Sequence, residues 1–164
     1  RDSSYTIYTN LHTNTAYSSL AAQVTKIFPI TLNTFIIPTI YGRFIFNDGI
    51  PFMYSNVIGG EGYNPHYEQQ IPFSGLTHTE STLKLLGNAQ IQVRHKFHEK
   101  QYLTLSGNYA IHQNQFSNFL QGKKIYGTSI GYGYDSPLGP IEGFICYSNR
   151  TNKLGFYLNI GFGF

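Results

Sequence analysis

The sequence has little charge, one cysteine, no tryptophan and no long apolar run. Only 12% of its 164 residues are charged, about half the share that a soluble domain usually carries. The single cysteine, Cys146, excludes an intramolecular disulfide and a cysteine-rich metal site. No run approaches the roughly 18 apolar residues that a membrane-spanning helix needs, so a span of that kind is excluded.

Aromatic residues and glycine are plentiful instead. Aromatic residues make up 16% of the chain, which also has 17 glycines, yet the mean hydropathy is only -0.22. This combination is typical of a transmembrane β-barrel, whose strands are apolar only at alternate residues. The net charge of +3 is too small and too scattered to indicate nucleic acid as a partner. No signal peptide begins at Arg1, so we expect a mature chain or a fragment.

The C-terminal segment 154–164 alternates strictly between large apolar residues and small or polar ones. Successive side chains of a strand point to opposite faces, so one face is continuously apolar while the other is small, polar and uncharged. A soluble strand would usually carry charged groups on its outer face. The pattern favours a strand with lipid on one side and a lumen on the other. The apolar positions are Leu154, Phe156, Leu158, Ile160, Phe162 and Phe164.

The same two-residue period recurs along the rest of the chain, and no helical period competes with it. It predicts one all-β domain over residues 1–164, a transmembrane antiparallel up-and-down β-barrel of about eight strands. The predicted strands cover residues 4–11, 20–28, 35–46, 89–97, 103–111, 126–134, 141–148 and 154–164.

The connections between these segments alternate between tight turns and longer loops. Outer-membrane barrels have short periplasmic turns and longer extracellular loops, so we expect the C-terminal Phe164 on the periplasmic side. The longest connection, about residues 47–88, is then an extracellular loop. Its apolar pieces, residues 50–58 and 71–73, predict that it packs against another part of the molecule.

The length of this loop bears on the size of the barrel. An eight-stranded barrel is just filled by its own side chains, so a re-entrant loop of this length does not fit inside it. Either the loop folds over the top, or the strands form half of a 16-strand barrel that another chain or a second copy completes. Small inward residues leave room beside the wall and favour a lumen filled by something else. They are Gly127, Ser129, Gly131, Gly133, Gly155, Gly161 and Gly163.

A few charged residues fall on the inward face of the predicted strands. Charges inside a membrane barrel need partners or water, and we expect Glu142 to pair with Arg94 or Arg43. We interpret these residues as a network that holds the shape of the lumen, with an ion or substrate path as the alternative. The predicted lumen charges are Arg43, Arg94, Lys96 and Glu142.

Aromatic residues gather near the ends of the predicted strands. Simple strand propensity would not place them at the ends, so we favour aromatic girdles at the two membrane interfaces. The candidate girdle residues are Tyr132, Tyr134, Tyr147, Tyr157, Phe162 and Phe164.

The sequence indicates neither a metal site nor a catalytic site. Its histidines lack the spacing of metal ligands, so we expect no metal and no cofactor. Segment 144–149 resembles the late strand of eight-stranded lipid A deacylases, with Ser148 as the nucleophile. Cys146 or Tyr147 occupies the position of the histidine base, and without an imidazole the serine is not activated. We therefore predict no catalytic residue.

Three motifs carry a resemblance to a known family. Residues 134–141 are similar to its Ser-Pro-Leu-Gly-Pro turn, and residues 54–60 to the start of its long extracellular loop. Residues 156–164 are similar to its final strand, the terminal assembly signal, here Phe156, Leu158, Ile160, Phe162 and Phe164. The chain thus resembles, over nearly its whole length, the bacterial surface antigen superfamily of outer-membrane assembly factors and two-partner secretion transporters.

The loop motif departs from the family at one position. Gly59 and Gly60 match it, and Gly62-Tyr63 replaces its Gly-Phe, but Glu61 stands where the family has an arginine. That arginine is thought to pin the loop inside the barrel. Residues 60–76 look more like barrels attached to patatin-like phospholipases of Bacteroidetes, whose catalytic domain is not in this chain.

The resemblance implies a location in the outer membrane of a Gram-negative bacterium, with a role as a membrane anchor or as a component of a larger assembly or secretion complex. Implied partners are outer-membrane lipid and lipopolysaccharide, the barrel assembly machinery during insertion, and a second copy or other outer-membrane proteins. On this interpretation the chain itself is not an enzyme. The alternatives are a lipid-modifying enzyme, either lipid A deacylase-like or a patatin phospholipase barrel, and a small passive pore.

Overall fold

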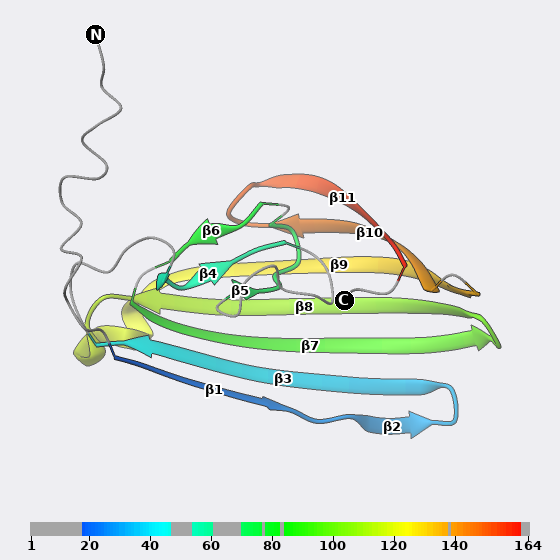
Figure 1. Ribbon diagram of the computed structural model, residues 1–164, viewed down its shortest axis with the longest axis horizontal. Helices are drawn as coiled ribbons and strands as arrows, with labels where there is room; N and C mark the ends of the chain where they lie inside the picture. The colour runs from blue at the N-terminus through cyan, green and yellow to red at the C-terminus, as the bar shows by residue number, and fades with distance from the viewer. Residues whose placement is uncertain are drawn as a thin grey trace, which may run out of the picture.

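A long, curved antiparallel sheet forms most of the protein in the computed structural model, which describes residues 18–46, 54–60, 70–76, 78–82, 84–137 and 139–161 (Figure 1). The predicted strand 4–11 lies outside the described residues, as do Phe162 and Phe164. The strands of this sheet are β1 (Ser19–Thr25), β2 (Phe28–Thr31), β3 (Thr34–Ile45), β7 (Leu85–His98), β8 (Gln101–Gln113), β9 (Lys123–Ser136), β10 (Gly139–Ser148) and β11 (Lys153–Ile160).

From β3 onward, each strand of the large sheet pairs with the next strand of that sheet along the chain. The order is β1-β3-β7-β8-β9-β10-β11, every pairing is antiparallel, and β2 continues β1 along the same edge of β3. The predicted all-β, up-and-down topology is therefore confirmed. Within the described residues the sheet is open, with β1 and β2 at one edge and β11 at the other. The described part of the chain contains no helix with the length and hydropathy of a membrane span.

The connections fall at two ends of the sheet. The turn end has the short links 32–33, 99–100 and 137–138, and the loop end has the links 46–84, 114–122 and 149–152. This separation of short from long connections is the one the sequence predicted. The long loop is slightly shorter than expected, because β7 already begins at Leu85 instead of residue 89. Which end lies outside the cell stays a prediction.

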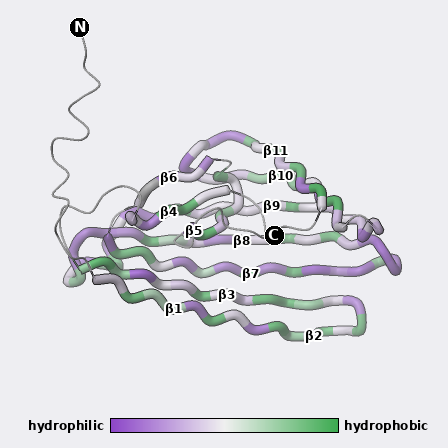
Figure 2. The backbone as a smooth tube through the Cα atoms, in the orientation of Figure 1, coloured by the Kyte–Doolittle hydropathy of each residue, from purple (hydrophilic) through white to green (hydrophobic). Residues whose placement is uncertain are grey.

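The two faces of the sheet reverse the usual arrangement of a soluble protein. On β8, Leu103 and Leu105 are exposed on the outer face, whereas Thr104 and Ser106 are buried on the inner face. The outer apolar residues of β11 are between 54% and 77% exposed. Along β1 the tube shows both green and purple stretches (Figure 2). An apolar outer face with a polar inner face is the pattern of a strand between lipid and a lumen.

Part of the long loop forms a second, small sheet. Its central strand β4 (Val57–Ile58) pairs in parallel with β5 (Gln70–Ile71) and antiparallel with β6 (Glu80–Ser81). This sheet lies over β8 and β9 near the loop end (Figure 1). The buried apolar cluster of the described chain is here, and it joins loop to wall. It contains Ile58, Ile71, Phe73 and Leu76 from the loop and Leu86, Ala110 and Ile125 from the sheet.

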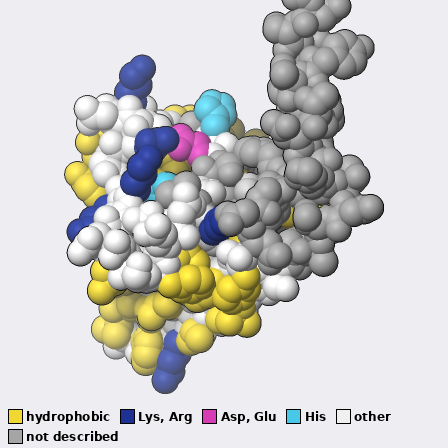
Figure 3. Space-filling model, turned by 90° about the vertical axis from the view of Figure 1, so that its left-hand side faces the viewer, with side chains coloured by type: hydrophobic (Ala, Val, Ile, Leu, Met, Phe, Trp, Pro, Cys, Tyr) yellow, Lys and Arg dark blue, Asp and Glu magenta, His cyan; other side chains and the backbone are white. Residues whose placement is uncertain are grey.

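A short 3-10 helix, η2 (Phe116–Gln121), closes the loop between β8 and β9. Its aromatic rings pack on the end of β3 and the residue that follows it. Phe116 lies 5.7 Å from Phe44 and 5.9 Å from Phe46, measured between ring centroids. Seen from the loop end, hydrophobic side chains gather on one part of the molecule, away from the acidic side chains (Figure 3). The loop end thus carries an aromatic cluster that sequence patterns alone did not single out.

Candidate functional site on the inner wall

The paired glycines of the loop motif lie at the junction of β4 and the segment 70–76. Gly59 (φ 117°) and Gly60 (φ 74°) both have left-handed backbone, which side chains disfavour. Gly59 N donates to Ile71 O at 3.0 Å, and Gln70 Nε2 donates to Gly59 O at 2.8 Å. These bonds fix the route of the loop toward the wall. Gly62 and Tyr63, the other predicted loop residues, lie outside the described residues.

Segment 72–76 reaches the inner face of the sheet through a cluster of three serine hydroxyls, here called the serine cluster. Ser74 Oγ lies 2.7 Å from Ser106 Oγ on β8 and 3.2 Å from Ser129 Oγ on β9. The two wall hydroxyls are 2.6 Å apart, because Ser106 and Ser129 are direct partners in the ladder. All three serines are buried. Neutral hydroxyls, each both donor and acceptor, therefore connect the loop to the wall.

Beside the serine cluster, glycine residues let the backbone of the loop approach the backbone of the wall closely. A Cβ at Gly127 of β9 would overlap the carbonyl oxygen of Ser74. A Cβ at Gly75 would overlap the backbone of Tyr147 on β10, and Gly75 has a φ of 84°. Asn108 Nδ2 also donates to Pro72 O at 3.4 Å. The loop is therefore seated directly on the wall, in the room that the small inward residues were expected to leave.

A wall arginine holds the start of the loop. Arg43 on β3 is buried, and its Nη1 donates to Asn56 Oδ1 at 3.3 Å and to Ser55 O at 3.4 Å. Asn56 in turn donates to Lys84 O at 2.9 Å. The expected alternative pairing of Arg43 with Glu142 is wrong, because Arg43 lies opposite Leu86, toward the loop end of β7. Glu142 lies near the turn end of the sheet.

Glu142 forms a compact cluster with Arg94 and Tyr102 near the turn end. Its side chain is 1% exposed, and Tyr102 Oη donates to its Oε1 at 2.7 Å. Arg94 Nη2 lies 3.6 Å from the same oxygen, and the Arg94 guanidinium lies 4.6 Å from the centre of the Tyr102 ring. A buried carboxylate needs such compensation to stay ionised. Lys96, the fourth predicted lumen charge, is exposed at the turn end.

A family model described as the OMP85 superfamily matches residues 3–164. The chain belongs to the OMP85 superfamily. The superfamily that the three motifs resembled is thereby confirmed, and it places the chain among outer-membrane β-barrels of the assembly and secretion type in Gram-negative bacteria. A search of curated proteins gives no match.

In this OMP85 domain the described part of the predicted terminal signal lies on the outer face of β11. Phe156, Leu158 and Ile160 are exposed there by 67%, 54% and 67%. Of the candidate girdle residues, Tyr132 and Tyr134 lie on the outer face at the turn end, and Tyr147 lies at the loop end. Tyr157 was misplaced: it pairs with Phe144 and therefore points to the inner face.

The residues weighed for catalysis or metal binding lie in or on the wall of this OMP85 domain. Ser148 is fully buried, and its Oγ accepts a hydrogen bond from Arg150 N at 3.2 Å. Cys146 is buried opposite Gly155. His95 Nδ1 lies 2.8 Å from Thr34 Oγ1, on the outer face. Across the described ranges, no group of three or more His, Cys, Asp or Glu residues lies close enough to hold a metal ion.

Sequence reasoning missed the serine cluster. Ser129 was recognised as a small inward residue, but Ser74 and Ser106 were not singled out. The useful signal was the register. Ser106 and Ser129 are partners on neighbouring strands, so a hairpin alignment of the two segments would have placed two hydroxyls side by side.

Proposed function

We propose that this chain is part of the wall of an outer-membrane barrel whose lumen is occupied by its own long loop. In this role it acts as a membrane anchor or as a component of a larger assembly or secretion complex. The observation that carries the proposal is the seating of segment 72–76 on the polar inner face, through the serine cluster, while the apolar outer face is left exposed.

The barrel is larger than the described sheet. Lipid offers no hydrogen bonds to backbone groups, so both open edges, β1 with β2 and β11, need strand partners in a membrane. A lumen that holds the loop is also wider than an eight-stranded barrel provides. The chain is therefore half of a barrel of about 16 strands, completed by further strands or by a second copy.

The described wall supports anchoring better than catalysis. Ser148 Oγ accepts a hydrogen bond from the backbone of Arg150, and the acidic Glu142 is bound to Tyr102 and Arg94. The resemblance of residues 60–76 to barrels behind patatin-like phospholipases favours a chain that anchors such a domain, without contributing catalytic residues of its own.

The decisive experiment tests the seat of the loop in native membranes. In a Cys146→Ser background, Ser74→Cys and Ser106→Cys are expected to form a disulfide after mild oxidation, because the two Oγ atoms are 2.7 Å apart. The matched control pairs Ser74→Cys with Thr104→Cys. Thr104 is on the same face of β8 as Ser106 but two residues nearer the turn end. The control pair is expected to form little or no disulfide. The proposal would be refuted if the Ser74→Cys, Ser106→Cys variant formed no disulfide, or if the folded chain stayed monodisperse in buffer without surfactant.

A further inference from the structure

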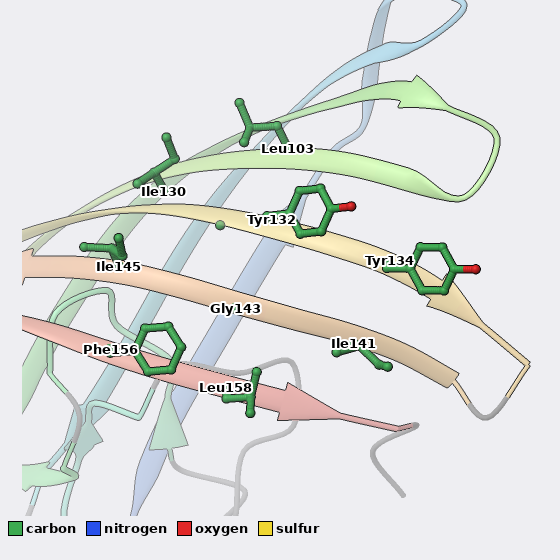
Figure 4. A pocket seen from close by; sticks show the side chains of 10 residues that line it. Leu103, Ile130, Tyr132, Tyr134, Ile141, Gly143, Ile145, Phe156 and Leu158 are labelled. Carbon is green, nitrogen blue, oxygen red and sulfur yellow. The ribbon is translucent and has the colours of Figure 1, made fainter.

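We propose that a groove over Gly143, on the outer face of the sheet, holds one acyl chain of a glycerophospholipid. The inference rests on the proposed function, because it requires this face to meet lipid, and on the sequence prediction that the turn end lies in the periplasmic leaflet. The groove has a volume of about 520 Å³. Its floor is the bare backbone of Gly143 in β10 (Figure 4).

The shape of the groove follows from strand register. Gly143 pairs with Tyr132 on β9 and with Leu158 on β11, so large side chains stand on both sides of a position that has none. Ile141 and Ile145 close the groove along β10 itself, since they are the next residues on the same face. Phe156 borders it from β11, as Figure 4 shows. An apolar depression bounded by large side chains of neighbouring strands suits an acyl chain.

The chemistry of the groove changes along its length. The lining is almost entirely apolar, and the exceptions are the hydroxyl groups of Tyr132 and Tyr134. Figure 4 shows both tyrosines beside the end of β9 that leads into the β9–β10 turn. Lys100 lies at this same end, because its carbonyl accepts a hydrogen bond from Asp135 N at 2.8 Å. Two hydroxyls at one end of an apolar slot, with a lysine in the adjacent turn, suit a phosphate headgroup above its acyl chain.

The proposed orientation selects the lipid. With the turn end in the periplasmic leaflet, the hydroxyl end of the groove meets glycerophospholipid headgroups and not lipopolysaccharide. One lysine and two hydroxyls also match a single phosphodiester group. The occupant is therefore a phospholipid such as phosphatidylethanolamine, held in a defined place on the outer face.

A second glycine on the same face supplies the control. Gly107 on β8 also points outward, but a Cβ there would meet nothing within 4 Å, whereas at Gly143 it would contact the Phe156 ring at 3.9 Å. Neither glycine has a positive φ, so both accept a side chain without backbone strain. Gly143→Leu fills the groove, and Gly107→Leu adds the same side chain to an open part of the surface.

The test measures lipid retention by native mass spectrometry of the full chain in detergent, titrated with phosphatidylethanolamine and, in a parallel arm, with lipid A. We expect wild type and Gly107→Leu to retain one phosphatidylethanolamine that Gly143→Leu binds at least about tenfold more weakly. Lys100→Gln is expected to weaken binding several-fold, whereas Lys124→Gln, near the loop end, leaves it unchanged.

The outcomes separate this inference from the proposed function. Equal retention by wild type and Gly143→Leu, equal loss in Gly107→Leu, or preferred binding of lipid A overturns the groove while the chain still enters membranes. A wild-type chain that does not enter membranes overturns both. Gly143→Leu must show the same heat-modifiable mobility as wild type, and Phe156→Ala, which opens the groove, must also weaken retention.

Discussion

At the scale of single residues, glycine sets where aromatic rings lie on the inner wall. A Cβ at Gly131 would overlap the Phe144 ring, and one at Gly133 would overlap the Tyr102 ring. In both cases a ring from a neighbouring strand covers the backbone of a glycine, an arrangement that offsets the weakness of glycine in strands. Over Gly133 this placement also brings the Tyr102 hydroxyl within 2.7 Å of Glu142.

The Glu142 cluster yields a prediction about charge. Arg94→Ala removes the cation beside a carboxylate that is 1% exposed, and breaking a buried pair in this way costs about 3–5 kcal/mol of stability. Because Arg94 is 25% exposed, we expect the lower end of that range, about 3 kcal/mol. Urea unfolding in detergent micelles measures it. Lys96→Ala, an exposed cation on the same strand, is the control and should cost less than about 1 kcal/mol.

A second prediction concerns Gly127. Gly127→Ala places a methyl group on the carbonyl oxygen of Ser74, so the loop must lift from the wall while the strands stay paired. We expect limited proteolysis within residues 54–84 to become about tenfold faster, which corresponds to a loss of about 1.4 kcal/mol in loop seating. Gly107→Ala has no neighbour within 4 Å and should leave the cleavage rate unchanged. Equal rates in all three proteins would contradict the contact.

At the scale of strands, the wall is specified by alternation. The outer residues of β8 stand between those of β7 and β9: Leu105 is partnered by Val93 on one side and Ile130 on the other. One apolar row therefore continues from strand to strand around the outer face. In lipid this row supplies the burial that a core supplies in water.

This apolar row predicts that the stability cost of an introduced charge depends on its depth in the membrane. Leu105→Arg puts a charge in the middle of the outer face and should cost about 2–4 kcal/mol, because charge is least tolerated near the bilayer midplane. Gln113→Arg lies on the same strand and face but at the loop end, so it should cost about 1 kcal/mol or less. Unfolding in lipid vesicles measures both. Similar costs at the two positions would mean that this face does not cross a bilayer.

The strands were predictable from sequence and the folded loop was not. Period-two patterns such as those of β8 and β9 are local, so their positions follow from residues next to one another. The strands β4, β5 and β6 are two residues long, and their pairing joins segments far apart in the chain. Their existence depends on the wall beneath them, where Ala110 and Ile125 complete the apolar cluster. No local pattern carries that information.

The inward charges were likewise predictable only in part. The inward positions of Arg43, Arg94 and Glu142 followed from alternation, but the partner of each depended on its position along the strand. Arg43 faces Leu86 and Arg94 faces Thr104, eight positions further along β7. At about 3.4 Å per residue this separates the two arginines by about 27 Å, so only Arg94 reaches Glu142.

At the scale of the whole molecule, the loop and the sheet act as one body. The small sheet, the serine cluster and the Arg43–Asn56 bond attach the loop at separate points of the inner face. On the loop-end side, Arg150 Nε also donates to Glu80 Oε2 at 3.0 Å, which ties β6 to the link between β10 and β11. A barrel built from this wall has its lumen narrowed by its own chain.

Loop removal tests that arrangement. Replacing residues 55–82 with a short Gly-Ser linker exposes the polar inner wall, so we expect open-channel conductance in planar bilayers where the intact protein shows little. The change also uncovers Leu86, Ala110 and Ile125, and stability should fall by several kcal/mol at about 25 cal/mol per Å² of apolar surface. Conductance that is the same with and without the loop would show that the loop does not narrow the lumen.

The serine cluster has a consequence for the environment in which the protein works. An ionic latch loosens as electrolyte rises or as its groups titrate, because mobile ions screen exposed charges. The hydroxyl groups of Ser74, Ser106 and Ser129 stay neutral over the physiological pH range, and all three side chains are buried. The attachment of segment 72–76 to the wall is therefore expected to change little between low and high salt, or between neutral and mildly acidic medium.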